Sequence, residues 1–334
     1  MSTDIKFHFT QTEHDPQVWG REDSDWAARM EEACSRIGDG RHRIVDSAEA
    51  ADIVVFWEPH QDLQAVWAPR LRADPLIQEF PDKAFVVSVE DNPLGFLPGL
   101  YCSLSKRLLD RRRHRSCFYH RTPNARLNSA STPVARRDPT RLASFVGARS
   151  HSVRDRLFKI GARLAGEGVH LRETERGRYN SDPRGLTLES ERTDYVESIL
   201  DARFSLCPRG NGVATFRLQE TMALARVPVV ISDEWEPIVG PDWSRFAVFV
   251  NERDIGRLPE ILRAYEPGWK EMGAMARQVF DQYYANGNYL KHSLDQIVEI
   301  YQSREHDERD CFSRWDEMIE TERRRRNLAG GALA

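Results

Sequence analysis

Short apolar runs alternate with amphipathic stretches along the first half of the chain. Residues 5–9 alternate polar and apolar side chains with a period of two, whereas residues 52–57 and 83–89 are apolar runs typical of buried parallel strands. Residues 26–37 carry the apolar spacing of a helix. Strands separated by helical stretches predict a parallel sheet covered on both faces, so we expect an α/β unit here.

The same alternation is clearer in the second half. From about residue 106 to 138 the pattern fails and turn signals follow a basic run, which indicates a connection between two domains. The predicted strands and helices beyond it cover residues 141–146, 153–165, 194–202, 203–207, 216–225, 227–232 and 247–251. Ser152 is the expected N-cap of the first of these helices. We predict α/β domains at residues 1–138 and 139–300, then a charged C-terminal helix at 301–334.

Size and charge narrow the classes of function. The 334 residues, 40% of them hydrophobic, suffice for two packed cores. Acidic and basic residues nearly balance, 52 against 48, so no overall field draws the chain onto a polyanion and we expect no nucleic-acid partner. The basic runs at 111–115 and 323–326 leave a nucleic-acid or anionic-membrane surface as an alternative. The second run follows several Glu on a charged helix, which favours a solvated helix face.

Cysteine usage and hydropathy predict a cellular location. The five Cys never form a C-x-x-C pair, N-x-[S/T] sequons are absent, and no window approaches the roughly 18 apolar residues of a spanning helix. We therefore expect a cytoplasmic protein without an integral membrane segment, a disulfide framework or a thiolate metal site.

The most informative stretch runs from Phe204 to Glu220, as a strand, a glycine-containing loop and a helix. Glycines let a backbone approach a ligand closely, and a loop leaving the carboxyl end of a parallel strand is where α/β sheets bind ligands. Arg209 and Arg217 each offer a guanidinium fork to phosphate oxygens, and Thr215 adds a hydroxyl. Glu220, one helical turn after Arg217, is suited to accept hydrogen bonds from ribose hydroxyls. This stretch therefore predicts a pyrophosphate-binding loop.

Two observations limit that interpretation. An Arg and a Glu three positions apart on a helix are also typical of a solvated ion pair. The loop matches neither G-x-G-x-x-G nor G-x-x-x-x-G-K-[S/T], so the pattern does not indicate a dinucleotide-binding fold or a P-loop NTPase.

The motifs around this loop resemble the C-terminal part of exostosin-type glycosyltransferases, glycosyltransferase family 47. The resemblance is carried by residues 207–212, 215–223 and 227–233 and extends over about residues 141–290. Outlying matches are Phe145 to Gly147, Arg154, Tyr195 to Phe204, Trp243 to Phe246 and Ile255 to Leu262. Where the family usually has Gly-Cys before the Val-Pro strand, this chain has Ala225-Arg226.

The resemblance implies a GT-B fold, in which two Rossmann-like domains face each other across a cleft. The N-terminal domain would be the acceptor side and the C-terminal domain would hold the nucleotide-sugar donor. Inversion at the anomeric carbon is implied, with the departing diphosphate stabilised by positive charge and not by a metal. No metal or other cofactor is expected. The implied nucleotide-sugar-binding residues are Gly147, Arg154, Arg209, Gly210, Asn211, Thr215, Arg217 and Glu220.

The N-terminal domain matches the family poorly, so candidates for the catalytic base come from the ends of its predicted strands. These candidates are His14, Asp15, Glu58, His60, Glu90 and Asp91. We favour Glu90 or Asp91, because the chain turns sharply there off a buried strand, although either is also a typical turn or cap residue.

Two further signals concern metal and sugar. Asp23-Ser24-Asp25 resembles the D-x-D signature that holds Mn²⁺ in other glycosyltransferases, but it precedes a predicted helix, where Asp and Ser are ordinary caps. Of the eight Trp, Trp235 and Trp243 are the candidates for stacking on a sugar.

We therefore expect an inverting, metal-independent transferase, active in polysaccharide or related biosynthesis. It would move a sugar from a nucleoside diphosphate, expected to be UDP, to a hydroxyl of a glycan or small-molecule acceptor. Two alternatives stay open. One is a transferase of a GDP-sugar, of the fucosyl type, and the other is a catalytically silent partner that binds a nucleotide sugar or glycan for another transferase.

Overall fold

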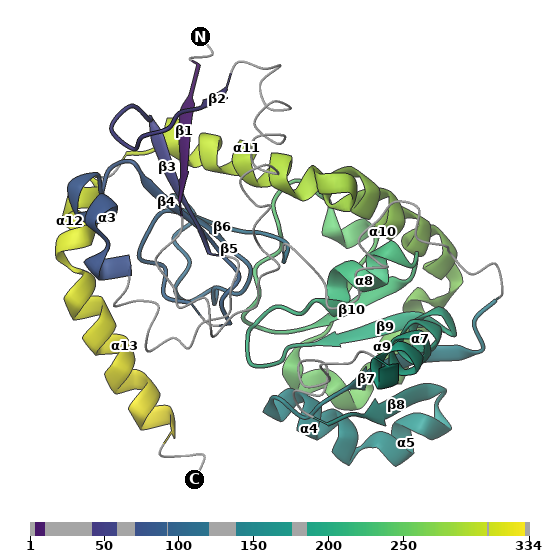
Figure 1. The fold of residues 1–334 in the computed structure, drawn as a ribbon. Coiled ribbons are helices and arrows are strands. Elements are labelled where there is room, and N and C mark those ends of the chain that lie inside the picture. Colours follow the sequence, from purple (N-terminus) through teal and green to yellow (C-terminus); the bar gives the residue numbers. More distant parts are fainter. Residues whose placement is uncertain are drawn as a thin grey trace. The chain divides into compact units, whose positions relative to one another are not determined.

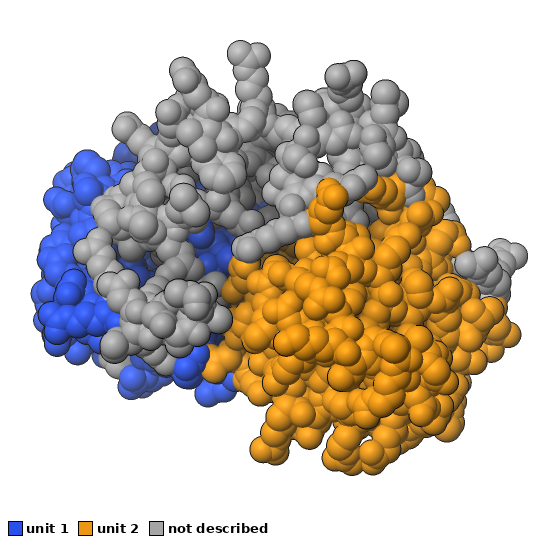
Figure 2. All heavy atoms as spheres, turned by 90° about the horizontal axis from the view of Figure 1, so that it is seen from below, with its two compact units in different colours: residues 1–117, 290–334 blue, residues 118–289 orange. Residues whose placement is uncertain are grey.

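The computed structural model describes residues 4–10, 42–58, 71–91, 93–119, 138–175, 186–305 and 307–330. The chain divides into two compact units, which we call unit 1 (residues 1–117 and 290–334) and unit 2 (residues 118–289). Figure 1 shows their elements and Figure 2 colours them blue and orange. Each unit is an α/β unit with a fully parallel sheet, as a GT-B fold requires. The cleft between them stays a prediction.

Unit 1 is built on a six-stranded sheet in the order β2-β1-β3-β4-β5-β6. Its central strands are apolar on both faces, and every residue of β4 is buried, as expected for a sheet covered on two sides. Its strands and first described helix are β1 (Lys6–Thr10), β2 (Arg43–Ile44), β3 (Ile53–Glu58), α3 (Pro75–Glu79), β4 (Ala84–Ser88), β5 (Gly99–Tyr101) and β6 (His114–Ser116).

The C-terminal helices pack within unit 1. They are α11 (Asn288–Gln302), α12 (Glu308–Ser313) and α13 (Trp315–Gly330). Trp315 lies 5.0 Å from the Phe96 ring, and Glu308 forms a buried ion pair with Arg113 at 2.6 Å. These contacts explain why the observed units differ from the predicted ranges 1–138, 139–300 and 301–334. They also bury Arg113, so the basic run at 111–115 is not a continuous exposed surface.

The buried ring of His114, on β6, is expected to make the stability of unit 1 sensitive to acid. Its ring is fully buried, and burial followed by the charge of Arg113 lowers its pKa to about 3. Between about pH 6.5 and pH 3, His114 is therefore protonated in the unfolded chain but neutral in folded unit 1. The contribution of His114 to stability is fully present above this window and is lost as the pH falls through it. Because of His114, we expect the free energy of unfolding to fall by about 2 kcal/mol between pH 6.5 and pH 5.

Urea unfolding on either side of this window checks the prediction. His114→Asn should flatten the dependence while keeping an acceptor for the Asp110 amide, which now donates to Nδ1 at 3.1 Å. His170→Asn is the control, since that ring is only partly buried. An unchanged slope in His114→Asn would contradict the assignment.

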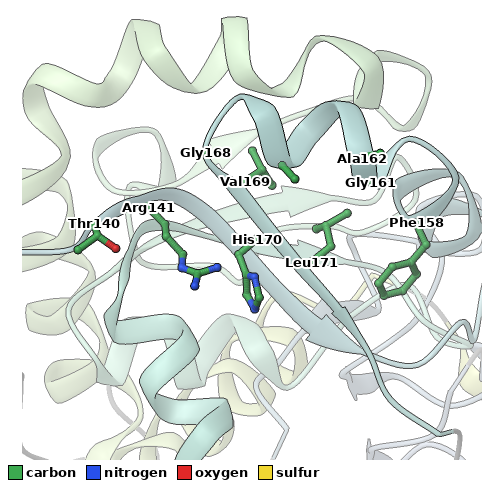
Figure 3. Close-up of a pocket in the computed structure, with 10 residues that line it drawn as sticks. Thr140, Arg141, Phe158, Gly161, Ala162, Gly168, Val169, His170 and Leu171 are labelled. Atoms are coloured by element: carbon green, nitrogen blue, oxygen red, sulfur yellow. The ribbon is translucent and has the colours of Figure 1, made fainter.

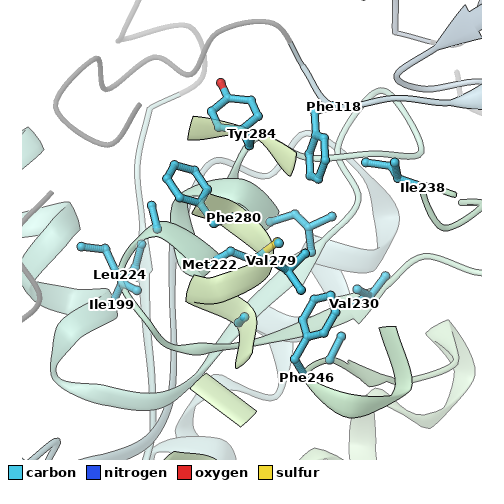
Figure 4. Close-up of a cluster of buried hydrophobic side chains, with 14 of the residues drawn as sticks. Phe118, Ile199, Met222, Leu224, Val230, Ile238, Phe246, Val279, Phe280 and Tyr284 are labelled. Atoms are coloured by element: carbon cyan, nitrogen blue, oxygen red, sulfur yellow. The ribbon is translucent and has the colours of Figure 1, made fainter. Parts of the chain in front are cut away.

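Unit 2 contains a five-stranded sheet in the order β11-β10-β9-β7-β8. One face packs against α4, α5 and α9, and the other against α7, α8 and α10 with the apolar cluster shown in Figure 4. Its elements are β7 (Arg141–Gly147), α4 (Ser152–Lys159), α5 (Gly161–Gly166), β8 (Val169–Glu173), α7 (Leu186–Leu200), β9 (Ala202–Pro208), α8 (Arg217–Ala223), β10 (Val227–Ile231), η4 (Trp243–Arg245), β11 (Val248–Phe249), η5 (Glu252–Arg257), α9 (Leu258–Tyr265), η6 (Glu266–Gly268), α10 (Trp269–Tyr283) and η7 (Ala285–Gly287). No helix among the residues described is long and apolar enough to cross a bilayer.

The corner between α8 and β10 accounts for the Ala225-Arg226 departure. Ala225 has φ of 51°, in the left-handed region that favours glycine. The Arg226 side chain is buried, donates to the carbonyls of Leu200, Leu224 and Ala225, and lies over the Trp269 ring at 5.5 Å. The arginine thus satisfies the carbonyls of a strained turn that a glycine would make without strain.

Ala225→Gly should therefore stabilise unit 2. Relief of the left-handed alanine, about 1–2 kcal/mol, exceeds the extra backbone entropy of an unfolded glycine, about 0.5–1 kcal/mol. We expect a rise in Tm of about 1–3 °C by calorimetry. Asn286→Gly is the matched control at the other non-glycine residue with positive φ among those described, and should gain less because Asn tolerates this conformation. A lower Tm for Ala225→Gly would show that the turn is not strained.

Candidate active site

The strand order of unit 2 locates the candidate site. From β7 the chain moves outward to β8 and then returns past β7 to β9, so the order reverses between β7 and β9. Open α/β sheets bind ligands at such a reversal, beyond the carboxyl ends of the strands. Here those ends are Gly147 and Pro208. Every predicted nucleotide-sugar-binding residue lies on the segments that follow these two strands, or on α4 and α8 next to them.

Arg154, on α4, ties the two strand ends together. Its Nε donates to the carbonyl of Arg209 at 3.0 Å, its Nη2 to that of Pro208 at 3.1 Å and its Nη1 to that of Ala148 at 3.3 Å. The guanidinium also lies 5.4 Å from the centre of the Phe145 ring. Arg154 therefore fixes the geometry of both loops while placing a positive charge between them.

Arg217, the first residue of α8, is a buried cation beneath the loop after β7. Its side chain lies between the rings of Phe145 and Tyr195, at 4.6 and 4.8 Å, and only 7% of the residue is exposed. Nη2 donates to the Val146 carbonyl. Nε and Nη1 have no hydrogen-bond partner, and no ion pair joins the side chain to a carboxylate, among the residues that the structure describes. Its charge is thus left for an incoming anion to balance.

Glu220 is also buried, at 4% exposure, and the Tyr195 hydroxyl donates to its Oε2. Burial is the main cause that raises the pKa of Tyr195, so this hydroxyl stays protonated and keeps its proton for Glu220. Because Arg217 and Glu220 both lie inside unit 2, the solvated ion pair that their spacing also suggested is not what forms.

The two predicted glycines lie in close packing against side chains of the site. A Cβ on Gly147 would lie 2.9 Å from the Phe145 ring and 3.3 Å from Arg217 Nη2. A Cβ on Gly210 would lie 3.0 Å from both Arg154 Nη2 and Ser150 Oγ. Neither glycine leaves room for a side chain between the loops and the two arginines.

The remaining predicted residues form the accessible part of the site. Arg209 and Thr215 are half-buried and Asn211 is exposed. Because the Arg217 guanidinium is covered, direct contacts with a ligand in this conformation fall mainly to these three side chains. Helix α8 begins at Arg217 and has only seven residues, so its dipole adds little to the arginine charges.

His151 is a site residue that the sequence did not reveal. It, and not the expected Ser152, is the N-cap of α4, with Nδ1 accepting from the Val153 amide at 3.3 Å. Burial, then the charges of Arg209 and Arg154, lower its pKa to about 4, so it is neutral at pH 7. The low frequency of His at N-caps explains why sequence reasoning passed over it.

The favoured base candidates lie in unit 1, directly after β4. Glu90 is 2% exposed, and its amide donates to Ser88 Oγ at 3.3 Å. Asp91 is half-buried, and its charge is one of the causes that raise the pKa of Cys102. Asp91 is therefore the more accessible carboxylate of the pair.

Other candidates fall outside the described structure. His14, Asp15, His60 and the side chain of Glu58 do so, as does the Asp23-Ser24-Asp25 triplet. Within the described ranges, no group of three or more His, Cys, Asp or Glu is placed to hold a metal ion.

A cavity of about 470 Å³ lies elsewhere in unit 2 (Figure 3). It is bounded by the beginnings of β7 and β8 and by α5, with Arg141, Phe158 and His170 among its lining residues. None of the predicted site residues lines it. Since parallel α/β sheets bind ligands at their carboxyl ends, this cavity is not the candidate site.

Comparisons with known proteins agree with the motifs. The sequence model of the Exostosin GT47 domain matches residues 118–265. The chain is 35% identical over 140 residues to the Exostosin-1 homolog of Caenorhabditis elegans, covering 40% of this chain and 32% of that protein. It is 30% identical over 116 residues to Exostosin-1 of Drosophila melanogaster, covering 34% of this chain and 14% of that protein. The matched region thus spans less than a third of these relatives.

Two solved structures show a distant overall similarity. The crystal structure of TarM aligns with a TM-score of 0.43 and 10% identity, over 82% of this chain and 58% of that chain. A glycosyltransferase from Rickettsia africae aligns with a TM-score of 0.41 and 9% identity, over 91% of this chain and all of that chain. The sequence matches are the stronger finding: residues 118–265 of this chain match the Exostosin GT47 domain, and the chain is similar in sequence to Exostosin-1 proteins.

Proposed function

We propose that this protein is a glycosyltransferase that moves a sugar from a nucleoside diphosphate to an acceptor hydroxyl, with the diphosphate held where β7 and β9 end. The observation that carries the proposal is the buried Arg217, whose charge has no described carboxylate partner and which lies directly beneath this point. A diphosphate would supply the missing negative charge. Arg154 and Arg209 add two further cations on the same two loops.

The residues divide between contact and positioning. Arg209, Asn211 and Thr215 are the proposed contacts to the diphosphate, because they are the accessible members of the set. Arg154 and Arg217 shape the loops and set the potential. Glu220 is covered like Arg217 and accepts a bond from Tyr195, so its contact with the ribose hydroxyls is proposed only for the donor-bound conformation.

The proposed reaction is a single displacement with inversion. Asp91 or Glu90 takes the proton from the acceptor hydroxyl, and the acceptor oxygen forms its bond to the anomeric carbon as the bond to the diphosphate oxygen breaks. Charge grows on the departing diphosphate, and preorganised cations beside it stabilise that charge more than water would. UDP is the proposed nucleotide, and the arginines take the place that a divalent metal occupies in other transferases.

A donor panel tests this proposal. The purified protein is incubated with UDP- and GDP-sugars, with and without a chelator, and release of nucleoside diphosphate is measured beside thermal stability. A donor at 100 times its Kd should stabilise the fold by about 2.7 kcal/mol. Metal-independent release from a UDP-sugar is expected. Preference for a GDP-sugar would change the proposed donor. Stabilisation without release of nucleoside diphosphate would favour the silent-partner alternative. The absence of both stabilisation and release would reject the proposal.

A further inference from the structure

Phe249 is an unusually exposed aromatic ring at the edge of the unit 2 sheet. It lies on the edge strand β11 and is 47% exposed. Among the described aromatic residues, only Tyr265 is similarly exposed. Its ring stacks on that of Trp235, with centroids 6.4 Å apart and planes 15° apart. Trp235 and Trp243, which sequence reasoning favoured for sugar stacking, are 3% and 6% exposed and cannot present a free face.

The two tryptophans instead support Phe249. Trp235 meets Trp243 edge-on, with centroids 5.2 Å apart, and Trp243 Nε1 donates to the Ile238 carbonyl at 2.8 Å. Phe249 is therefore flanked by a buried aromatic pair that restricts its position. A ring fixed in this way loses little side-chain entropy when a ligand packs on its open face.

Strand register places Phe249 level with the candidate site. Phe249 pairs with Val230, and Val230 with Cys207. The pairing of Ser144 with Ser205 places Val146 beside Cys207. The Val146 carbonyl accepts the hydrogen bond from Arg217. At about 4.8 Å between strands, Phe249 lies about 10 Å from Cys207 along this row and about 14 Å from Val146.

The loop after β10 connects the two regions. Ser232 Oγ donates to the carbonyl of Val213, in the glycine loop, at 2.8 Å. Asp233 and Glu252, which follow β10 and β11, bond to each other's amides at the same edge of the sheet. The segment after β10, which carries Trp235 next to Phe249, is thus bonded to the loop that would hold the donor.

The size of the exposed ring restricts its occupant. A phenylalanine side chain buries roughly 150–250 Å² when covered, so about 100 Å² is open here, against about 800 Å² per partner in a stable protein interface. The patch suits one sugar ring and is too small for a protein. The partly positive C–H face of a pyranose complements the negative face of an aromatic ring.

We propose that Phe249 is a stacking subsite for a sugar ring of the acceptor glycan, one or two residues away from the reacting hydroxyl. The role as acceptor rests on the proposed transferase function. Binding of the glycan itself does not, because it needs neither donor nor turnover.

The test is binding of labelled wild-type protein to a printed array of defined oligosaccharides, followed by titration with the tightest ligand found. Phe249→Ala should weaken binding by ten-fold or more, and Phe249→Trp should stay within three-fold of wild type. Tyr265→Ala is the matched control, since that exposed ring is at the end of α9, and it should bind as wild type does. Calorimetric Tm values and UDP affinity are measured for each variant, and neither should change in Phe249→Ala.

Each outcome decides one claim. Loss of glycan binding with UDP affinity intact supports the subsite. An array without any bound oligosaccharide, or equal binding by Phe249→Ala, overturns the subsite and leaves the transferase proposal standing if a nucleotide still binds. Glycan binding lost in Phe249→Ala, in a protein that binds no nucleotide, would keep the subsite and reject the donor site.

Discussion

Arg217→Ala should lower kcat/KM for sugar transfer by about 10²–10³-fold, as loss of a preorganised charge at a developing anion typically does. Substitution removes a buried cation beneath the Gly147 loop, whose Nε and Nη1 have no hydrogen-bond partner among the described residues. Arg217→Lys should rescue little, because an ammonium cannot both reach the Val146 carbonyl and lie flat between the Phe145 and Tyr195 rings. Steady-state kinetics with the best donor measure the effect.

Arg226→Ala is the matched control. Arg226 is equally buried, also donates to carbonyls and also lies over an aromatic ring, but it is at the opposite, amino end of the sheet. It should lower stability while leaving kcat/KM of the folded protein within a few-fold of wild type. Equal losses of activity in the two variants would mean that Arg217 acts through folding alone.

Gly99→Ala should prevent unit 1 from folding normally. A Cβ at this position would lie 2.1 Å from the Val86 carbonyl oxygen, and the residue has φ of 142°, which side-chain-bearing residues rarely adopt. The strained conformation and the overpacking each cost about 1–3 kcal/mol, a large part of the 5–15 kcal/mol that stabilises a typical domain. We expect little soluble protein and a loss of the cooperative unfolding transition.

Gly166→Ala provides the comparison. Gly166 ends helix α5, and a Cβ there would meet no atom within 4 Å. The substitution should be neutral or stabilising by about 0.5–1 kcal/mol, because alanine loses less backbone entropy in a helix. A soluble Gly99→Ala protein with wild-type Tm would show that β4 and β5 are not packed as described.

The longer strands of both sheets could be predicted, because a buried parallel strand has a short apolar run as its sequence. The short strands β2, β5 and β6 and the half-buried β8 were missed, and β6 lies within residues 106–138, which we had expected to be a connection between domains. The predicted strand 203–207 corresponds to β9 and 227–232 to β10, with ends that differ by a residue or two. The return of the C-terminal helices to unit 1 could not be predicted, since it depends on the distant pairs Arg113–Glu308 and Phe96–Trp315. Such pairs leave no periodic signal in the sequence.

The site was predicted as a set of residues, but their division of labour was not. Arg217 was expected from its place on the helix, and Arg154 from the family resemblance, to bind phosphate directly, whereas in the structure both donate to backbone carbonyls. His151 and Tyr195 entered only with the structure, because their roles come from contacts made across segments. The exposed ring proved to be Phe249 and not a tryptophan, since burial of single aromatic residues cannot be read from composition.

Hydrogen exchange measured by mass spectrometry shows where on the chain the donor nucleotide binds. Backbone amides are compared in free protein and in protein saturated with UDP or GDP. We expect slower exchange in peptides covering residues 147–151 and 209–216, on both sides of the β7–β9 reversal. We expect no change at residues 161–171, the segment that lines the cavity at the beginnings of β7 and β8. Protection confined to residues 161–171, or absent from both strand ends at saturation, would contradict the proposed donor site.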